Sequence, residues 1–251
     1  MKLWTAFPRA AGALAALILF FAMATPAQTT NGLSDAEIQG RQLAQQLCDG
    51  RPTENFTNTG VFKIKNAEGK TIEISLKCEV IVMATNWGSL YEMRNDWGTE
   101  SLSVVHEPSQ KNRYYFHRDF GDEAVNKSLS GDQTFLPFHS DFWLCDLGLE
   151  FFHWPAQKVL KKEIKRSRGC TVLESTNPNP SANSYSRVVS WIDGESGGIV
   201  QAEAYDFNGK LLKEFAPKSF KKVNGQWELQ EMEIRNVQTG SRTQLEFDLN
   251  K

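Results

Sequence analysis

Three consecutive residues of the sequence, His139, Ser140 and Asp141, have the side-chain types of a hydrolytic active site. A serine hydroxyl that is activated by a neighbouring base attacks ester and amide bonds. Three further carboxylates could assist such a site: Glu174, Asp193 and Asp206. However, the sequence contains no G-x-S-x-G or H-E-x-x-H motif, and serine and aspartate are also residues that commonly begin helices. We therefore interpret Ser140 and Asp141 as helix caps and predict that the protein is not an enzyme.

The N-terminus has the features of a secretory signal peptide. Positively charged residues precede an apolar run, residues 10–24, and the small and polar residues TPAQTT follow it. The run is shorter than the roughly 20 apolar residues that a membrane-spanning helix needs. Cleavage after Ala24 and cleavage after Ala27 both fit the sequence, and an uncleaved N-terminal anchor is the alternative. We expect residues 1–27 to be a signal peptide and residues 28–251 to form a single exported domain.

The composition gives no reason to expect a metal ion or a nucleic acid as a partner. The chain has 28 basic and 30 acidic residues, so it lacks the excess of positive charge that binds a phosphate backbone. None of its four cysteines forms a C-x-x-C pair, and its four histidines lack the spacing of zinc ligands. We expect no metal, no cofactor and no nucleic acid.

The four cysteines indicate disulfide bonds, which form readily in exported proteins. The sequence alone permits three pairings. We favour the bonds Cys48–Cys78 and Cys145–Cys170, because each pair would join elements that are neighbours along the chain.

An aromatic segment, residues 140–155, reads SDFWLCDLGLEFFHWP and is several-fold richer in aromatic residues than the whole chain, which is 11% aromatic. As a helix, the segment would place Asp146, Glu150 and His153 at i, i+4 and i+7, on one polar stripe, with apolar residues on the other sides. Pro155 would stop this helix. We therefore predict one helix that is buried on nearly all sides, either as a permanent plug or as a lid that opens.

Most of the remaining sequence has the period of two that predicts β-strands. A helix comes first, because Ser34 and Glu37 form a capping box. Residues 71–83, TIEISLKCEVIVM, alternate in polarity, and Asn-Gly and Asp-Gly turns divide the last third of the chain into an antiparallel meander. We expect about nine to eleven strands and two or three helices, with the polar stretch over residues 119–134 as a mobile separator. A sheet this long must curl or close, and the helices must cover its apolar face.

Two separated parts of the sequence resemble the LolA-like proteins, which are often labelled outer-membrane lipoprotein-sorting proteins. The resemblance spans about residues 34–250. In the aromatic segment, its features are Ser140, Asp141, Phe142, Asp146 and Leu147. In the last part of the chain, they are Tyr205, Asp206, Gly209 and Lys210, followed by Trp227, Gly240 and Thr243. It implies a mainly β fold with some α: an incomplete antiparallel β-barrel whose open concave side is covered by an N-terminal helix and by the aromatic plug or lid helix. In the periplasmic carriers of this family, the apolar hollow takes up acyl chains.

The resemblance implies a non-catalytic carrier or binder of lipid or acylated protein in the periplasm of a Gram-negative-type bacterium. We cannot place a counterpart of the buried lid-closing arginine of the family's lipoprotein chaperone, so ATP-coupled loading is not carried over. A Cys145–Cys170 bond would also fasten the aromatic helix. The expected wall of the hollow consists of Ile72, Ile74, Leu76, Tyr114, Phe116, Val189, Trp191, Met232 and Ile234. The expected cover consists of Phe142, Trp143, Leu147, Phe151 and Trp154.

Two alternatives to the carrier remain open. The first is a module of the same fold that binds an envelope protein or senses envelope stress. A basic run could face such a partner or anionic headgroups, or it could be a solvated hairpin; its residues are Lys158, Lys161, Lys162, Lys165, Arg166 and Arg168. The second alternative, an envelope hydrolase, is the less favoured one, because no catalytic motif supports it.

Overall fold

The computed structural model describes residues 32–96, 98–108, 110–121, 124–131, 137–223 and 226–249. From Leu33 onward, these residues belong to one compact unit, Leu33–Lys251. The expected signal peptide, residues 1–27, lies outside the described residues. Among the helices of the described part, none is long and apolar enough to cross a membrane.

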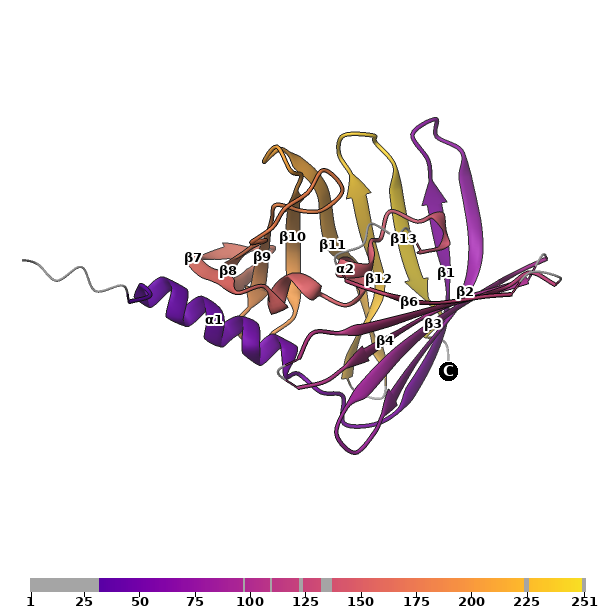
Figure 1. Cartoon of the computed structure of the whole chain (residues 1–251), viewed down its shortest axis with the longest axis horizontal. Coiled ribbons are helices and arrows are strands. Elements are labelled where there is room, and N and C mark those ends of the chain that lie inside the picture. The colour runs from indigo at the N-terminus through magenta and orange to yellow at the C-terminus, as the bar shows by residue number, and fades with distance from the viewer. Residues whose placement is uncertain are drawn as a thin grey trace, which may run out of the picture. The chain divides into compact units, whose positions relative to one another are not determined.

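The described residues contain thirteen strands, which form one antiparallel sheet, and a few helices (Figure 1). The strands are β1 (Phe56–Lys65), β2 (Thr71–Val82), β3 (Trp87–Asn95), β4 (Gly98–His106), β5 (Arg113–Asp119), β6 (Ala124–Leu129), β7 (Ala156–Lys165), β8 (Arg168–Thr176), β9 (Arg187–Asp193), β10 (Ile199–Tyr205), β11 (Leu211–Val223), β12 (Gln226–Asn236) and β13 (Arg242–Phe247). The helices are α1 (Asp35–Cys48), α2 (Leu144–Leu147) and the 3₁₀ turns η1 (Pro137–His139) and η2 (Glu150–His153).

The order of the strands shows that two meanders are joined edge to edge. Strands β1 to β6 run outward to one edge of the sheet, strands β7 to β13 return from the other edge, and β13 pairs with β1. At this junction Phe62 lies opposite Leu245 of β13 and Ile74 of β2. The sheet is not closed, because β6 and β7 form its two edges in the described part of the chain. The expected curled antiparallel sheet is therefore confirmed.

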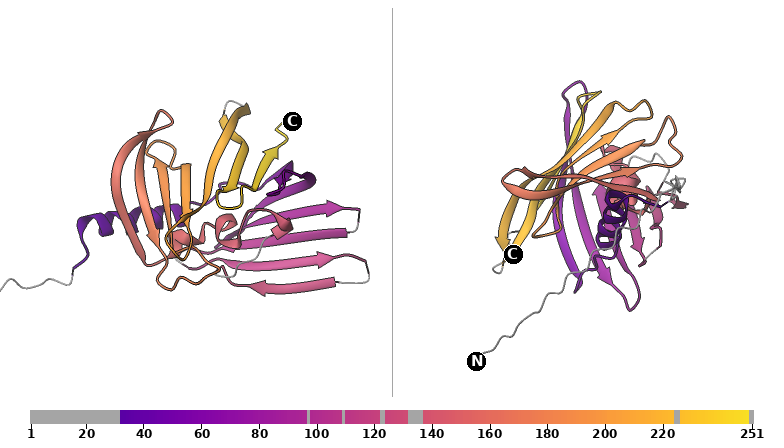
Figure 2. Two further views of the ribbon diagram at one scale, coloured as in Figure 1. Left: turned by 90° about the horizontal axis from the view of Figure 1, so that it is seen from above. Right: turned by 90° about the vertical axis from the view of Figure 1, so that its left-hand side faces the viewer.

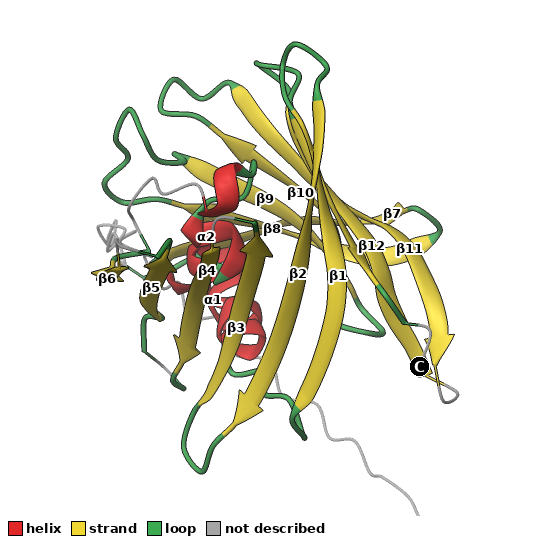
Figure 3. Ribbon diagram, turned by 90° about the vertical axis from the view of Figure 1, so that its right-hand side faces the viewer, coloured by secondary structure: helices red, strands yellow, loops and turns green. Residues whose placement is uncertain are grey.

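The connection between β6 and β7 must cross from one edge of the sheet to the other. It carries α2, which lies between the two halves of the curved sheet in three views (Figures 1, 2 and 3). We call residues 137–154 of this connection the plug segment. The topology therefore makes it the element that covers the inner face of the sheet.

Two apolar cores lie on this inner face, and the plug segment contributes to both. In the first, Phe138, Phe142 and Leu144 pack among residues of β1, β2, β4, β5 and β13. In the second, Phe151 and Phe152 pack with residues of α1, β8, β9 and β10. The plug segment therefore connects the two meanders through their cores.

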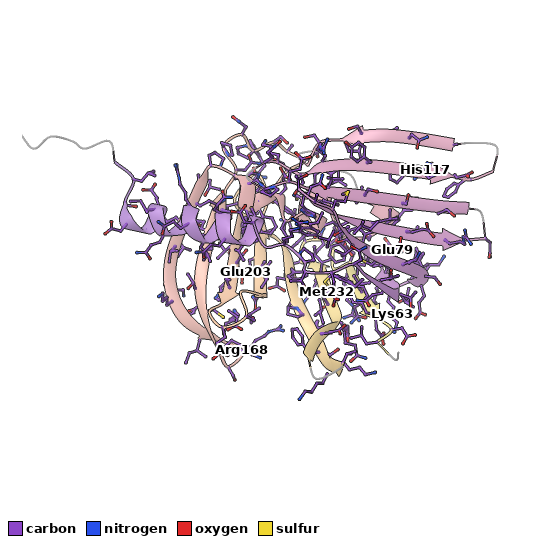
Figure 4. The ribbon with its side chains drawn as sticks, turned by 90° about the horizontal axis from the view of Figure 1, so that it is seen from below. Lys63, Glu79, His117, Arg168, Glu203 and Met232 are labelled. Carbon is purple, nitrogen blue, oxygen red and sulfur yellow. The ribbon has the colours of Figure 1, made fainter. Side chains whose placement is uncertain are left out.

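The outer face of the sheet is mainly polar. Lys63 and Glu203 are labelled in Figure 4, and each alternates with neighbours that belong to the inner cores. Lys63 Nζ lies 2.7 Å from Glu246 Oε2, and Glu203 Oε2 accepts a hydrogen bond from the hydroxyl of Tyr205 at 2.8 Å. Strand β9 is an exception, because it is buried on both faces.

The N-terminal helix α1 begins at the predicted capping box. The backbone N–H of Ser34 donates to Glu37 Oε2 at 2.8 Å, and the N–H of Glu37 donates to Ser34 Oγ at 3.4 Å. Gly40 lets the helix approach β7 closely, since a Cβ atom there would stand 2.5 Å from the backbone nitrogen of Lys158. The helix therefore covers the start of an edge strand.

Two sequence predictions about the strands were wrong. The count of nine to eleven strands is too low, because β3 was not recognised and β6 lies within the polar stretch that we expected to be a mobile separator. Both strands carry many polar residues. An edge strand such as β6 needs only backbone hydrogen bonds to β5 to form, so its sequence lacks a continuous apolar face.

Candidate functional site

The plug segment is a series of short turns, so the prediction of one helix over residues 140–154 was wrong. The α2 turn ends at Gly148, and Leu149 adopts a left-handed conformation with φ 49°. Trp143, rather than Ser140 or Asp141, is the N-cap of α2. Trp154 is extended, as expected of a residue before proline.

The predicted polar stripe was also wrong, because two of its three residues face the protein interior. Glu150 is 3% exposed, and the side chain of Asp146 is 12% exposed. His153 is half-buried. Buried polar groups need hydrogen-bond partners, and the sheet supplies them at several places along the plug segment.

A buried lysine of β11, Lys213, lies against α2. Its Nζ donates to the backbone oxygen of Asp141 at 2.6 Å and lies 3.5 Å from Asp146 Oδ2. The ammonium group is also 3.9 Å from the centre of the Trp143 ring, which stacks on Tyr185 at 4.4 Å. The Tyr185 hydroxyl donates to Asp146 at 2.9–3.0 Å. We call these five residues the lysine clasp.

Burial disfavours the charged forms of Lys213 and Asp146, whereas the attraction between their opposite charges favours them. Burial lowers the pKa of Lys213, whereas the charge of Asp146 opposes this effect. Burial likewise raises the pKa of Asp146, and Lys213 opposes that shift. The pKa of Tyr185 is raised by burial and by the charge of Asp146, so this phenol stays a hydrogen-bond donor. The net shift of each pKa therefore follows burial, and the charge of the partner limits it.

Strand β13 holds the same end of the plug segment. Thr243 is fully buried, and its hydroxyl accepts the N–H of Asp141 at 2.8 Å and donates to Asp141 Oδ2 at 2.9 Å. Ser241 Oγ donates to Asp141 Oδ1 at 2.6 Å. Asp141 therefore joins the plug segment to a strand at the centre of the sheet.

A second buried polar cluster lies around Glu150. Its Oε2 accepts hydrogen bonds from the Tyr114 hydroxyl at 3.0 Å and from Asn112 Nδ2 at 3.1 Å. Asn112 Nδ2 also donates to the backbone oxygen of Gly148 at 2.6 Å. Tyr114 is fully buried, so this cluster anchors the middle of the plug segment to β5.

Further side chains satisfy the backbone of the plug segment at its ends. Gln157 Nε2, at the start of β7, donates to the carbonyls of Phe151 and Trp154 at 2.9 and 2.8 Å. Ser175 Oγ of β8 donates to Gln157 Oε1 at 2.7 Å. At the other end, Glu100 Oε1 of β4 accepts the N–H of Phe138 at 3.4 Å. The segment is thus hydrogen-bonded to both meanders.

The structure brings most of the predicted wall and cover residues together. Leu76, Tyr114, Phe116, Phe142 and Ile234 lie in the first core, with Ile74, Leu147 and Met232 at its margin. Phe151 and Trp154 lie in the second core, with Trp143 at its margin.

Three predicted wall residues lie elsewhere. On β9, Val188 and Ile192 point to the inner face and pack in the second core. Their neighbours Val189 and Trp191 therefore point to the opposite face, where they pack in a third cluster with Cys170 and Val172. Ile72 is 43% exposed.

The predicted disulfide bonds were wrong, because all four cysteines are free. Cys145 packs in the second core, which lies on the inner face of β8. Cys170 belongs to β8 and points to its opposite face, into the third cluster, so the two sulfur atoms lie on different sides of the sheet. Burial raises the pKa of Cys48 to about 12 and that of Cys78 to about 11. The aromatic segment is therefore fastened by hydrogen bonds and ions rather than by a disulfide.

The residues that could have formed a hydrolytic site have structural partners instead. Ser140 is buried, and its Oγ accepts the N–H of Phe142 at 3.2 Å. Glu174 Oε2 lies 3.2 Å from Arg187 Nη1. Asp193 and Asp206 each accept hydrogen bonds within the turn that follows their strand.

The basic run lies along edge strand β7 and its turn to β8. Several of its members have partners: Lys161 pairs with Glu163 at 2.7 Å, Lys165 lies 4.4 Å from the centre of the Trp191 ring, and Arg166 donates to the backbone oxygen of Pro217 at 2.6 Å.

Sequence reasoning missed the residues that hold the plug segment, above all Lys213 and Tyr185. The sequence did contain an indication for Lys213. It lies two residues before Phe215 on β11, and residues two apart on a strand point to the same face, which here is the inner one. Glu150 and Asn112 gave no such signal, since their partners come from distant parts of the chain.

Acid is expected to destabilise the protein through His106. Burial lowers the pKa of His106 to about 4 from an ordinary value of 6.5, and Trp87 stacks on its ring at 3.7 Å. Between these two pH values the unfolded chain binds a proton that the folded chain does not, so stability is lost as the pH falls. We expect the free energy of unfolding to drop by about 2–3 kcal/mol from this group between pH 7 and pH 4.5.

Urea titrations at the two pH values measure this loss. His106→Gln should lose that much less stability between them than the parent protein does, and His139→Gln, at an exposed position, should behave like the parent. If both variants showed the parent's pH dependence, the half-buried His106 would not be the source of the acid sensitivity.

Comparisons with known proteins identify the fold. A family model described as "Uncharacterized protein" matches residues 91–250. No curated protein matches the sequence. A crystal structure of a DUF1329 family protein from Desulfovibrio piger superimposes with a TM-score of 0.69 at 21% identity, over 86% of this chain and 92% of that chain.

Two further crystal structures have the same architecture. A putative outer membrane lipoprotein-sorting protein domain from Vibrio parahaemolyticus has a TM-score of 0.70 and 20% identity, over 84% of this chain and 91% of that chain. A LolA superfamily protein from Nitrosomonas europaea has a TM-score of 0.58 and 14% identity, over 86% and 92%. The chain therefore has the LolA-like fold that its sequence resembles, and it belongs to the family, described as "Uncharacterized protein", whose model matches residues 91–250.

Proposed function

We propose that the protein is an exported, non-catalytic binder of lipid or acylated molecules, in which the plug segment occupies the apolar inner face until a ligand displaces it. The observation that carries this proposal is the burial of Phe138, Phe142, Phe151 and Phe152 of the plug segment, each 4% exposed or less, on the concave side of the sheet. A putative lipoprotein-sorting domain with the same fold supports the ligand class.

An acyl chain and the plug segment would compete on nearly equal terms. Burying the five aromatic residues of the plug segment that are buried, namely these four phenylalanines and Trp154, contributes about 10 kcal/mol at about 2 kcal/mol each. A fourteen-carbon chain gains about 11 kcal/mol at about 0.8 kcal/mol per CH₂. In the closed state, in which the plug segment lies on the inner face, the lysine clasp and the Glu150 cluster add further interactions. Without a ligand, this state is therefore more stable than a state in which the segment has left the inner face.

The chemistry of the inner face supports binding rather than catalysis. The thiols of Cys48, Cys78 and Cys145 have raised pKa values because they are buried, so they are poor nucleophiles. Asp141 and Ser140 are engaged in holding the plug segment. The signal-like N-terminus supports export, and the location that we propose for this binder is the periplasm of a Gram-negative-type bacterium, where lipid and acylated proteins are available as ligands.

A reversible crosslink tests whether the plug segment must move. The side chains of Asp141 and Thr243 are in contact, so the double variant Asp141→Cys, Thr243→Cys can form a disulfide between the plug segment and β13. We expect the oxidised variant to bind a fluorescent long-chain fatty acid at least tenfold more weakly than the same variant after reduction. The parent protein with and without reductant is the matched control.

Lipid extracted from the protein purified from its native periplasm, identified by mass spectrometry, provides the second measurement. Equal binding by the oxidised and reduced variant would show that the plug segment is a permanent part of the core. No fatty-acid binding in either form, together with no co-purifying lipid, would sink the proposal and favour a protein-binding module.

A further inference from the structure

A groove of about 290 Å³ lies where α1, the β4–β5 connection and the end of the plug segment meet. It opens beside the second core, and the core residues Ala44, Phe152 and Trp154 form part of its lining. Its lining residues are Arg41, Ala44, Gln45, Cys48, Gln110, Lys111, Phe152, His153, Trp154, Pro155 and Gln157.

The groove is positively charged, although the whole chain is slightly acidic. Arg41 of α1 and Lys111 of the β4–β5 connection supply two cations, and the lining contains no carboxylate. Burial and the charge of Lys111 lower the pKa of His153, which disfavours a third cation in the groove. The carboxylate of Asp49, beyond the lining, accepts a hydrogen bond from Gln45 Nε2 at 2.8 Å. The groove is therefore suited to an anion.

The other part of the lining is apolar. Ala44, Phe152 and Trp154 are buried and form a wall together with Pro155. The indole Nε1 of Trp154 is a buried donor without a hydrogen-bond partner among the described residues. An acceptor-rich group with an apolar tail would match both parts of the groove, since its charge would meet the cations and its tail would meet the wall.

We propose that this groove binds a single-chain alkyl carboxylate, with the carboxylate between Arg41 and Lys111 and the chain along Phe152 and Trp154. Ligand sites usually enclose roughly 300–1,000 Å³, so a groove of about 290 Å³ suits one chain rather than two. The inference rests on the proposed lipid-binding function for its ligand class. It adds a second site and a headgroup, and binding there leaves the plug segment in place.

Calorimetric titration with decanoate and with decanol tests the headgroup. The parent should bind decanoate about tenfold more tightly than decanol, because only decanoate carries the charge that the two cations attract. The double variant Arg41→Gln, Lys111→Gln should lose this preference and bind both compounds equally. Both residues are exposed, so the variant should keep the parent's melting temperature.

A matched variant and one conservative change complete the experiment. Lys162→Gln, Lys210→Gln removes the same charge at two exposed positions outside the groove and should retain the preference for decanoate. Trp154→Phe should weaken decanoate binding several-fold, because it shortens the apolar wall along which the alkyl chain lies.

Two results would overturn the proposal: equal binding of decanoate and decanol by the parent, or the same preference in the parent and in the Arg41, Lys111 variant. The function proposed above can fail independently when its crosslink at residues 141 and 243 is tested in the Arg41→Gln, Lys111→Gln background, in which the groove no longer holds the carboxylate of the fatty acid. Decanoate binding that persists in the oxidised crosslinked protein would support the groove even if the plug segment never opens.

Discussion

Replacement of Lys213 by methionine is expected to lower the free energy of unfolding by about 3–5 kcal/mol. The lysine is 2% exposed, and its ammonium group lies 3.5 Å from Asp146 Oδ2. Methionine fills a similar volume but leaves the carboxylate of Asp146 buried without its counter-ion. It also removes the hydrogen bond to the Asp141 carbonyl and the contact with the Trp143 ring. Since small proteins have a total stability of about 5–15 kcal/mol, this single change would remove a large part of it.

Urea unfolding of three variants separates the ion pair from the volume of the side chain. In the double variant Lys213→Met, Asp146→Asn the buried charge is absent, so we expect it to be clearly more stable than Lys213→Met alone. Lys218→Met is the matched control on the same strand. Its partner Glu233 lies 2.7 Å away, but the lysine is 38% exposed, and the loss should stay below about 1 kcal/mol. Similar small losses at positions 213 and 218 would contradict the buried clasp.

The sheet could be predicted from the sequence because its strands and turns are determined mainly by residues close together in the chain. The turns at Asp206 and Asn236 are stabilised by their own side chains, and the alternation of β2 and β10–β13 depends on the residues within each strand. Strand β6 and the irregular plug segment could not be predicted in the same way. Their conformations depend on partners distant in sequence, such as β5 for β6 and Lys213 for α2.

The error at Asp146 and Glu150 has a simple physical origin. The helical interpretation assumed that charged residues face water, which is the usual case. In this fold the segment crosses the concave face of the sheet, so most of its residues contact protein, although Leu149 remains 39% exposed. Asp146 and Glu150 are tolerated there because Lys213, Tyr185 and Tyr114 supply the donors that water would have supplied. Only the three-dimensional structure shows these partners.

The same interactions bear on the choice between plug and lid. A permanent plug needs only apolar packing, whereas the plug segment also contains two buried acidic groups that cost free energy unless they are paired. The hydrogen bonds and ion pairs of these acidic groups form in only one position of the plug segment. They are all broken when the segment leaves the inner face. The clasp and the Glu150 cluster therefore give the segment one well-defined closed state, which an acyl ligand would have to outcompete as a whole.

Gly148→Ala is expected to lower the free energy of unfolding by about 3–5 kcal/mol, because it inserts a methyl group into the Glu150 cluster. A Cβ atom at this position would stand 1.9 Å from the Tyr114 hydroxyl oxygen and 3.0 Å from Asn112 Nδ2. Both groups are donors to Glu150. The alanine must therefore displace Tyr114 and leave a buried carboxylate with fewer hydrogen bonds.

A double-mutant cycle with Tyr114→Phe shows whether this hydroxyl is the cause. Tyr114→Phe removes the atom closest to the new methyl group, so the double variant should be at least 1 kcal/mol more stable than the sum of the two single losses predicts. Gly169→Ala is the matched control, because a Cβ atom there would contact nothing within 4 Å, and its effect should lie within about 0.5 kcal/mol. Additive losses in the cycle would mean that Gly148 is constrained by something other than Tyr114. The other candidate is Asn112, whose Nδ2 would stand 3.0 Å from the new methyl group.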